Sequence, residues 1–229
     1  MSDLLETIEV ETAPNPTAAV IWMHGLGADG NDFVPVVPEL DLTGLGPVRF
    51  VFPNAPLRAV TINNGTVMRA WYDIVPGDLE GNVRLPDAEG IRESQAQIDA
   101  LIAREAGRGI PARRIVLAGF SQGGAITLQA GLRHAERLAG LLVLSSYLPL
   151  AETVATEAAA ANRDVPVFMA HGAYDPLIPL DRAVRSREAL QQLGYAIAWH
   201  EYPMQHSVCQ EEIQAIGAWL RQVLKSVAK

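Results

Sequence analysis

The chain has 229 residues, of which 49 % are hydrophobic and 19 % charged, a composition that suits a soluble protein with a large buried core. Its formal net charge of −8 argues against a nucleic-acid partner, because binding to a phosphate backbone needs clustered lysines and arginines. The most apolar window, residues 138–151, is shorter than a membrane span, so we expect no stable membrane insertion.

The N-terminal residues MSDLLETIEVE carry acids where a secretory signal would have a basic region followed by an apolar one. The chain also has one cysteine, Cys209, which cannot form an internal disulfide bond. Both features fit a reducing compartment, and we expect a cytoplasmic protein.

Short β-rich runs alternate with helical patterns along the chain. That alternation predicts an α/β fold whose central sheet is mostly parallel and is covered by helices on both faces. We expect strands near residues 5–11, 18–24, 48–52, 115–119, 140–145, 165–170 and 195–201. Nothing resembling a linker divides the sequence, so we expect a single domain over residues 1–229.

The first two expected strands lie close together and are joined by the residues APNP. We therefore expect them to pair as an antiparallel hairpin at the N-terminal edge of the sheet. The Ala-rich stretch 147–164 is too short to form a separate cap domain, which predicts a fairly open active site.

A surface helix is expected from Asp87 to Ala106, because apolar residues recur there on one stripe. Asp87 is a suitable cap for its start, and Gly107 for its end. The other expected helices follow Ser121, span Asp181–Leu193 and run from about Val208 to Val227.

The residues GFSQGG place Ser121 between glycines at both two-residue offsets, directly after an expected strand and before an expected helix. A sharp strand-to-helix turn strains its apex residue and crowds the residues two positions away, which glycine relieves. Such a turn raises the serine hydroxyl above the sheet, at the positively polarised start of a helix. The pattern and its context therefore predict that Ser121 is a nucleophile.

A serine nucleophile needs a histidine base, and the histidine needs an acid to fix its tautomer. Asp175 lies in the loop after the expected strand 165–170, at the edge where the carboxyl ends of parallel strands collect functional groups. Asp164 precedes that strand, and Asp181 is better explained as a helix cap. Asp175 is therefore the expected acid.

Two histidines follow Asp175 in the sequence. His200 lies inside an expected strand, which favours a packing role. His206 lies in a loop before the last helix, where it can reach both the acid and the nucleophile, so it is the expected base. A zinc site made by these two histidines is excluded by their spacing of six residues with Pro203 between them.

The residues HGLGADG match the dinucleotide-binding fingerprint at Gly25, Gly27 and Gly30. That motif requires a helix to start at once, whereas Pro35 and Pro38 interrupt this one. Backbone N–H groups offer a better interpretation, because an exposed N–H after the first buried strand can join one after the nucleophile to form an oxyanion hole.

The expected oxyanion donors are the N–H groups of Leu26 and Gln122. His24, just before the first of them, is more easily explained as a hydrogen-bond partner that fixes the loop than as a catalyst. Cys209, at the start of an amphipathic helix, is expected to pack rather than to react.

Six stretches carry a family resemblance: VIWMHGLGADG, FPNAP, VTINNG with MRAWYDI, LAGFSQGGA, HGAYD and EYPMQH. Together, in this order and over nearly the whole chain, they resemble the bacterial carboxylesterase and acyl-protein thioesterase family of small α/β-hydrolases. The resemblance implies a triad of Ser121, Asp175 and His206, an oxyanion hole from the backbone of Leu26 and Gln122, and no cofactor, metal or cap domain.

The stretch MRAWYDI, with Met68 and Trp71, resembles the loop that borders the acyl groove in this family, and we expect both residues and Leu177 to contact substrate. The chain departs from its relatives beside the base. They commonly have Gly before the histidine and an acid after it, where this chain has Gln205 and Ser207.

We therefore expect a serine carboxylesterase that acts on small-molecule or lipid esters. An acyl-protein thioesterase and a lysophospholipase would use the same groups, and a non-catalytic relative that binds a small ligand is an alternative of another class. Whether the protein forms a homodimer stays open.

Overall fold

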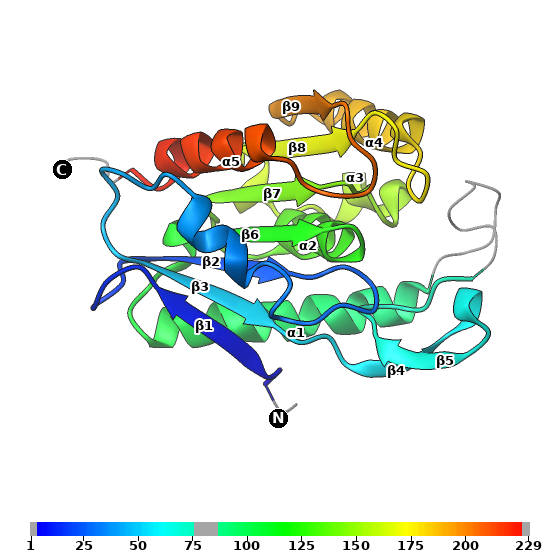
Figure 1. The fold of residues 1–229 in the computed structure, drawn as a ribbon, viewed down its shortest axis with the longest axis horizontal. Coiled ribbons are helices and arrows are strands. Elements are labelled where there is room, and N and C mark those ends of the chain that lie inside the picture. Colours follow the sequence, from blue (N-terminus) through cyan, green and yellow to red (C-terminus); the bar gives the residue numbers. More distant parts are fainter. Residues whose placement is uncertain (1–3, 76–86, 226–229) are drawn as a thin grey trace.

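Seven strands form one sheet in the order β1-β3-β2-β6-β7-β8-β9 in the computed structural model, which describes residues 4–75 and 87–225 (Figure 1). Their bounds are β1 Thr7–Glu11, β2 Ala18–Met23, β3 Val48–Pro53, β6 Ile115–Phe120, β7 Gly140–Leu144, β8 Val167–Gly172 and β9 Ile197–Tyr202. All neighbouring pairs are parallel except β1 with β3. The predicted mostly parallel α/β sheet is confirmed.

The antiparallel edge strand is β1, but its partner differs from the one expected. β1 pairs with β3, with Ile8 opposite Phe52, and not with β2. Both edges of β2 are occupied by parallel neighbours, β3 and β6. The expected pairing of the first two strands is therefore wrong. β2 is an interior strand, and the short connection between β1 and β2 does not make them neighbours in the sheet.

Helices cover both faces of the sheet. Their bounds are α1 Ala88–Gly107, α2 Gln122–Arg133, α3 Ala151–Glu157, α4 Leu180–Gln192 and α5 Gln210–Val223, with short 3-10 turns at Val34–Glu39, Thr61–Asn63, Ala112–Arg114 and Ala160–Asn162. Side chains of β2 alternate between two apolar clusters, as expected of a strand buried on both faces.

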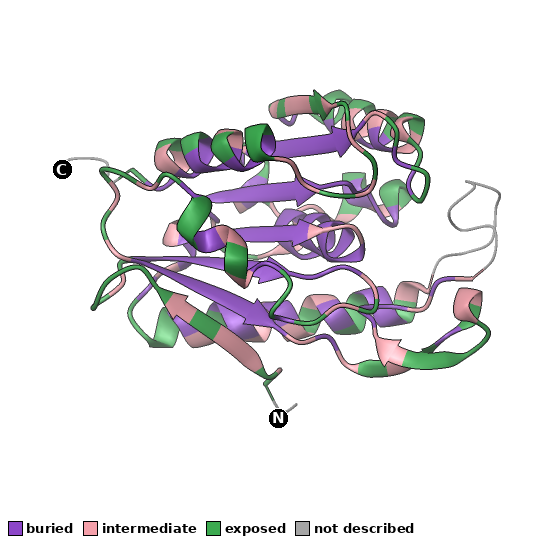
Figure 2. Cartoon of the chain, viewed as in Figure 1, coloured by how far each residue is buried: buried purple, intermediate pink, exposed green. Residues whose placement is uncertain are grey.

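One cluster packs the sheet against α1, α2, α3 and α4, and the other packs it against α5 and the turn Val34–Glu39. In Figure 2 the interior strands of this sheet, β3, β2, β6, β7 and β8, are accordingly purple, while β1 and β9 at the two edges are mostly pink and green. Within the part of the chain that the structure describes, no helix combines the length and apolar character needed to cross a membrane.

The ends of the helices follow local chemistry. Asp87 caps α1 as expected, since its side chain accepts a hydrogen bond from the backbone N–H of Gly90 at 2.9 Å. α4 starts at Leu180, one residue earlier than expected. Asp181 therefore lies in the first turn, paired with Arg185, and does not cap the helix. α5 ends at Val223, and the expected end at 227 lies outside the described residues.

The β-hairpin of β4, Leu57–Val60, and β5, Thr66–Arg69, was not expected from the sequence. Its turn contains Asn64 and Gly65, both with a positive φ, of 56° and 75°. These two residue types adopt that conformation more readily than others. The hairpin projects beside α1 at the end of the molecule where β4 and β5 are labelled (Figure 1).

A buried ion cluster ties the end of α1 to the sheet edge. The carboxylate of Glu105, whose side chain is 0 % exposed, lies 2.6 Å from Arg49 on β3 and 2.9 Å from Arg108. Arg104 adds a third contact at 3.1 Å. A buried charge is costly unless it is paired in this way, so the cluster fixes how α1 lies against β3.

Candidate active site

Ser121 stands at the turn between β6 and α2. Its φ of 54° and ψ of −120° are a strained conformation for a residue other than glycine. A Cβ on Gly119 would overlap the backbone of Gly123, and one on Gly123 would overlap the backbone of Met23 and His24. The two flanking glycines therefore allow the close approach that the sequence analysis expected of them.

Asp175 lies in the loop after β8, with its side chain fixed from two sides. Its Oδ1 accepts hydrogen bonds from the backbone N–H groups of Leu177 and Ile178, each at 2.9 Å. The carboxylate is fully shielded from solvent, so these contacts replace water and hold the plane of the group.

His206 lies in the loop between β9 and α5, and its Nδ1 is 2.6 Å from Oδ2 of Asp175. Two backbone hydrogen bonds join the loops that carry these residues: the N–H of Ala173 donates to the carbonyl of Tyr202 at 2.8 Å, and that of Tyr174 to the carbonyl of Met204 at 3.0 Å. The imidazole and the carboxylate thus belong to one hydrogen-bonded unit.

His171 is a neighbour of this unit that the sequence analysis did not single out. Its Nε2 lies 2.8 Å from the carbonyl oxygen of Ile178 and 3.5 Å from Oδ2 of Asp175. Burial lowers the pKa of His171, so the ring is neutral and its Nε2–H donates to Ile178. The signal was present in the HGAYD stretch, where a histidine precedes the acid by four residues.

Ser121 and His206 line one cavity of about 360 Å³. The other lining residues are Gly25, Leu26, Ala28, Asp32, Ile62, Asn63, Tyr72, Ile74, Phe120, Gln122, Tyr147, Leu177 and Ile178. The hydroxyls of Tyr72 and Tyr147 are 2.7 Å apart and add a polar contact to a wall made largely of apolar side chains. The cavity has the size and lining of a small-molecule site.

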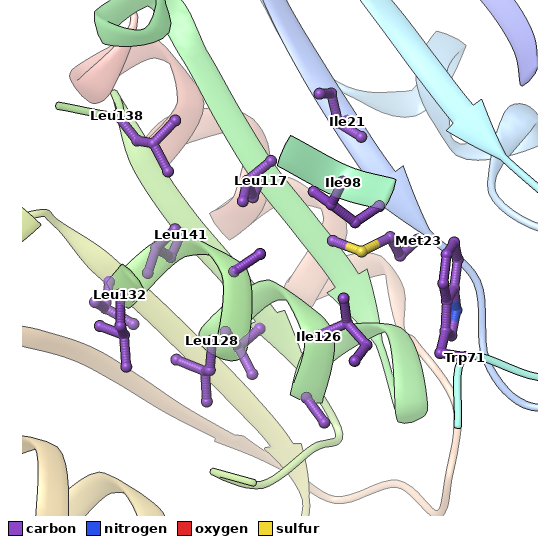
Figure 3. Packing of buried hydrophobic residues seen from close by; sticks show 14 of the residues in the cluster. Ile21, Met23, Trp71, Ile98, Leu117, Ile126, Leu128, Leu132, Leu138 and Leu141 are labelled. Carbon is purple, nitrogen blue, oxygen red and sulfur yellow. The ribbon is translucent and has the colours of Figure 1, made fainter. Parts of the chain in front are cut away.

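The three residues expected to contact substrate lie in different environments. Leu177 lines the cavity and is 56 % exposed. Met68 is not among the lining residues but contacts one of them, Asn63, whose side-chain amide is 3.3 Å from its sulfur. Trp71 is 0 % exposed and packs in the core beside Met23 and Ile126, so a direct contact with substrate is wrong for this residue (Figure 3).

Leu26 and Gln122, the expected oxyanion donors, both line the cavity. Within residues 4–75 and 87–225, neither backbone N–H donates to a protein acceptor. The following residue, Gly27, is anchored by a hydrogen bond to the carbonyl of Arg69 at 2.9 Å. One N–H group from the loop after β2 and one from the first residue of α2 are therefore available in the cavity that Ser121 lines.

The side chain of Gln122 has a role that the sequence analysis missed. Its Oε1 accepts from the backbone N–H of Trp71 at 2.8 Å, and its Nε2 donates to the carbonyl of Tyr72 at 2.7 Å. The start of α2 is thus joined to the segment that contributes Tyr72 to the cavity.

The other two histidines of the sequence analysis take the structural roles expected of them. His24 accepts a hydrogen bond from the backbone N–H of Ala55 at Nε2, 3.0 Å away, and its Nδ1 lies 2.7 Å from the carbonyl oxygen of Gly25. His200 stacks on Phe168, with the ring centroids 4.7 Å apart. The fingerprint-like glycines lead into a 3-10 turn and not an α-helix, as the prolines indicated.

Residues 6–224 match the family described as phospholipase/carboxylesterase. The chain belongs to this family. A curated relative, acyl-protein thioesterase 1 of Gibberella zeae, is 42 % identical over 218 residues, which cover 93 % of each chain. The corresponding protein of Neurospora crassa is 41 % identical and covers 93 % of this chain and 89 % of the relative.

Solved structures agree with this assignment. Acyl-protein thioesterase 2 of Zea mays superposes with a TM-score of 0.84 at 26 % identity, over 96 % of this chain and 99 % of that one. Arabidopsis thaliana SOBER1 also gives 0.84, at 27 % identity, over 91 % and 99 %. This member of the phospholipase/carboxylesterase family is a serine hydrolase with the α/β-hydrolase fold, acting on ester bonds. The motif resemblance to the family is confirmed, although the curated relatives above are fungal and not bacterial.

Proposed function

We propose that the protein hydrolyses carboxylic esters through an acyl-enzyme formed on Ser121, with His206 as general base and Asp175 as the acid that orients it. The observation that carries this proposal is geometric. Ser121 and His206 line the same cavity, and Nδ1 of His206 is hydrogen-bonded to a carboxylate that cannot turn away. Nε2 is left to accept the Ser121 proton.

Each half of the reaction uses the same groups. As Oγ of Ser121 attacks the carbonyl carbon, its proton passes to Nε2 of His206, which then gives it to the leaving alcohol. Water next loses a proton to His206 and attacks the acyl-enzyme, which releases the acid and restores Ser121. Asp175 stabilises the imidazolium at both stages.

The N–H groups of Leu26 and Gln122 hold the oxyanion in this scheme. Gln122 is the first residue of α2, so its N–H also carries the positive end of the helix dipole. Donors that are in place before the reaction stabilise the developing charge without reorganising, and losing one typically costs about 3 kcal/mol of transition-state stabilisation. The residues of the site supply every group that the scheme uses.

A fluorophosphonate probe tests the nucleophile. We expect wild-type protein to be labelled, Ser121→Ala to be unlabelled and without esterase activity, and Ser207→Ala, which changes an exposed serine next to His206, to behave as wild type. Wild-type protein that resists the probe would contradict the proposal and favour the alternative of a non-catalytic, ligand-binding relative.

A thioesterase activity is the second candidate, because the curated relatives reported above are named acyl-protein thioesterases. Nitrophenyl esters and acyl thioesters of increasing chain length separate the two on purified protein. Activity that collapses above about four carbons on both series would argue against thioesterase and lysophospholipase roles alike, since both need room for a long acyl chain. A small or lipid ester remains the expected substrate, a cytoplasmic location stays a prediction, and whether the protein forms a homodimer stays open.

A further inference from the structure

Trp71 forms hydrogen bonds with three separate parts of the fold. Its indole Nε1–H donates to the carbonyl of His24 at 2.9 Å, and its backbone N–H donates to Oε1 of Gln122 at 2.8 Å. Its own carbonyl accepts from the hydroxyl of Ser94 on α1. The ring is completely buried, so each of these hydrogen bonds is shielded from water.

Two of these bonds end beside the proposed oxyanion donors. His24, held by the indole, lies two residues before Leu26 in the same loop. Gln122, held through its side chain, carries the other N–H on its own backbone. The remaining amide hydrogen bond, from Nε2 of Gln122 to the carbonyl of Tyr72, closes the link between the start of α2 and the segment 71–72.

We propose that Trp71 is a positioning residue, which keeps the N–H groups of Leu26 and Gln122 in register with each other through one shared indole and backbone. This inference rests on the proposed function. An oxyanion hole works only when its donors are fixed within about half an ångström of the position that the charged oxygen takes. Trp71 adds hydrogen bonds to both donor segments beyond the pairing of β2 with β6, although it touches no substrate itself.

The variant Trp71→Phe keeps an aromatic ring in the core, with some loss of volume, and removes one hydrogen bond, from the indole N–H to His24. The matched control is Trp22→Phe on the opposite face of β2. Trp22 is 1 % exposed, and its Nε1 has no hydrogen-bond partner among the described residues. Both variants lose the same volume, so a difference between them reports the hydrogen bond.

The measurement is kcat and KM for a short nitrophenyl ester, per active site titrated with a fluorophosphonate, together with inhibition by a trifluoromethyl ketone. This ketone binds by adding Oγ of Ser121 to its carbonyl carbon, which makes the carbonyl oxygen an oxyanion. We expect Trp71→Phe to lower kcat per site about tenfold, to leave KM within about twofold, and to weaken the ketone about tenfold. A role in stability alone would lower the number of active sites and leave kcat per site unchanged.

Equal kinetics per site for Trp71→Phe and Trp22→Phe would overturn the inference. If Trp71→Phe yields no titratable sites, Gln122→Met decides, because it removes both side-chain hydrogen bonds to segment 71–72 at similar volume and is expected to show the same loss in kcat and in ketone binding. Failure of the proposed function is distinguishable, since wild-type protein would then not be titrated at all.

Discussion

Nδ1 of His206 lies 2.6 Å from Oδ2 of Asp175, and the other oxygen of that carboxylate is held by two backbone N–H groups. The carboxylate can therefore present only an acceptor to the ring. This fixes the proton of a neutral imidazole on Nδ1 and leaves Nε2 able to accept a proton, as the proposed mechanism requires.

Asp175→Asn is expected to lower kcat/KM by about 10³–10⁴-fold, because an amide N–H facing Nδ1 favours the opposite tautomer. Ester hydrolysis measured per mole of folded protein checks this. Asp164→Asn, which changes a surface aspartate paired with Arg137, should keep wild-type kinetics. Retention of more than a tenth of the activity by Asp175→Asn would exclude the assigned role.

His171→Ala is expected to lower kcat about tenfold, because it removes the donor that holds the carbonyl of Ile178 and the polar contact at 3.5 Å from Asp175. It should also destabilise the fold by about 1–3 kcal/mol, the cost of leaving a buried carbonyl unpaired. His200→Ala removes a stacked ring on β9 and should affect urea unfolding but not kcat. Similar kcat values for the two variants would argue against a role for His171 in holding the acid.

The buried side chain of Glu212 should give the free energy of unfolding an unusual dependence on pH. It is completely buried near the start of α5, and burial raises its pKa from 4.5 to about 8, although a hydrogen bond with the backbone of Cys209 opposes the shift. The folded state therefore binds a proton that the unfolded state has lost. The stability that this group contributes is complete below about pH 4.5 and is lost as the pH rises to about 8.

Glu212→Gln removes that titration. The free energy of unfolding of wild-type protein, relative to this variant, should fall by about 3–4 kcal/mol between pH 5 and pH 8, and by about 5 kcal/mol over the whole titration, which is the shift in pKa converted at 1.36 kcal/mol per unit. Glu211→Gln, at the exposed neighbouring position, should follow wild type. Parallel pH profiles for wild type and Glu212→Gln would show that the buried carboxylate does not titrate in this range.

Glu105→Ala should destabilise the protein by up to about 3 kcal/mol, because it removes the buried carboxylate that Arg49 and Arg108 share at 2.6 and 2.9 Å and leaves Arg49 with Glu11 at 2.9 Å. Glu93→Ala on the same helix is the matched control. Its side chain is 60 % exposed and 3.8 Å from Arg58, so the change should cost less than about 1 kcal/mol. Urea unfolding at pH 7 compares them, and equal midpoints would contradict the importance of the cluster.

The strand pattern and the G-x-S-x-G turn could be predicted because both depend on neighbours in the sequence. β2 is a continuous apolar run and β1 alternates, which distinguishes an interior strand from an edge strand. The choice of β3 as partner of β1 depends on contacts across about forty residues, which the local pattern does not contain. The β4–β5 hairpin, by contrast, carried a readable signal in Asn64-Gly65 that was not used.

Ser121, Asp175 and His206 could be predicted as site residues from their order in the chain and their loop positions, because each follows a strand at the same edge of the sheet. The prediction that Trp71 contacts substrate was wrong for a physical reason. A large aromatic near a site is equally compatible with lining the cavity and with supporting its wall, and only burial and the direction of its N–H distinguish the two.

The positive φ of Ser121 makes the stability of the fold and the proposed catalytic activity compete at this position. A side chain held at φ 54° and ψ −120° costs about 1–3 kcal/mol that glycine would largely avoid. Ser121→Gly should consequently melt at a higher temperature than the wild-type protein while having no nucleophile. Selection for heat resistance alone would favour glycine at this position, and the hydroxyl is needed there only for the reaction proposed above.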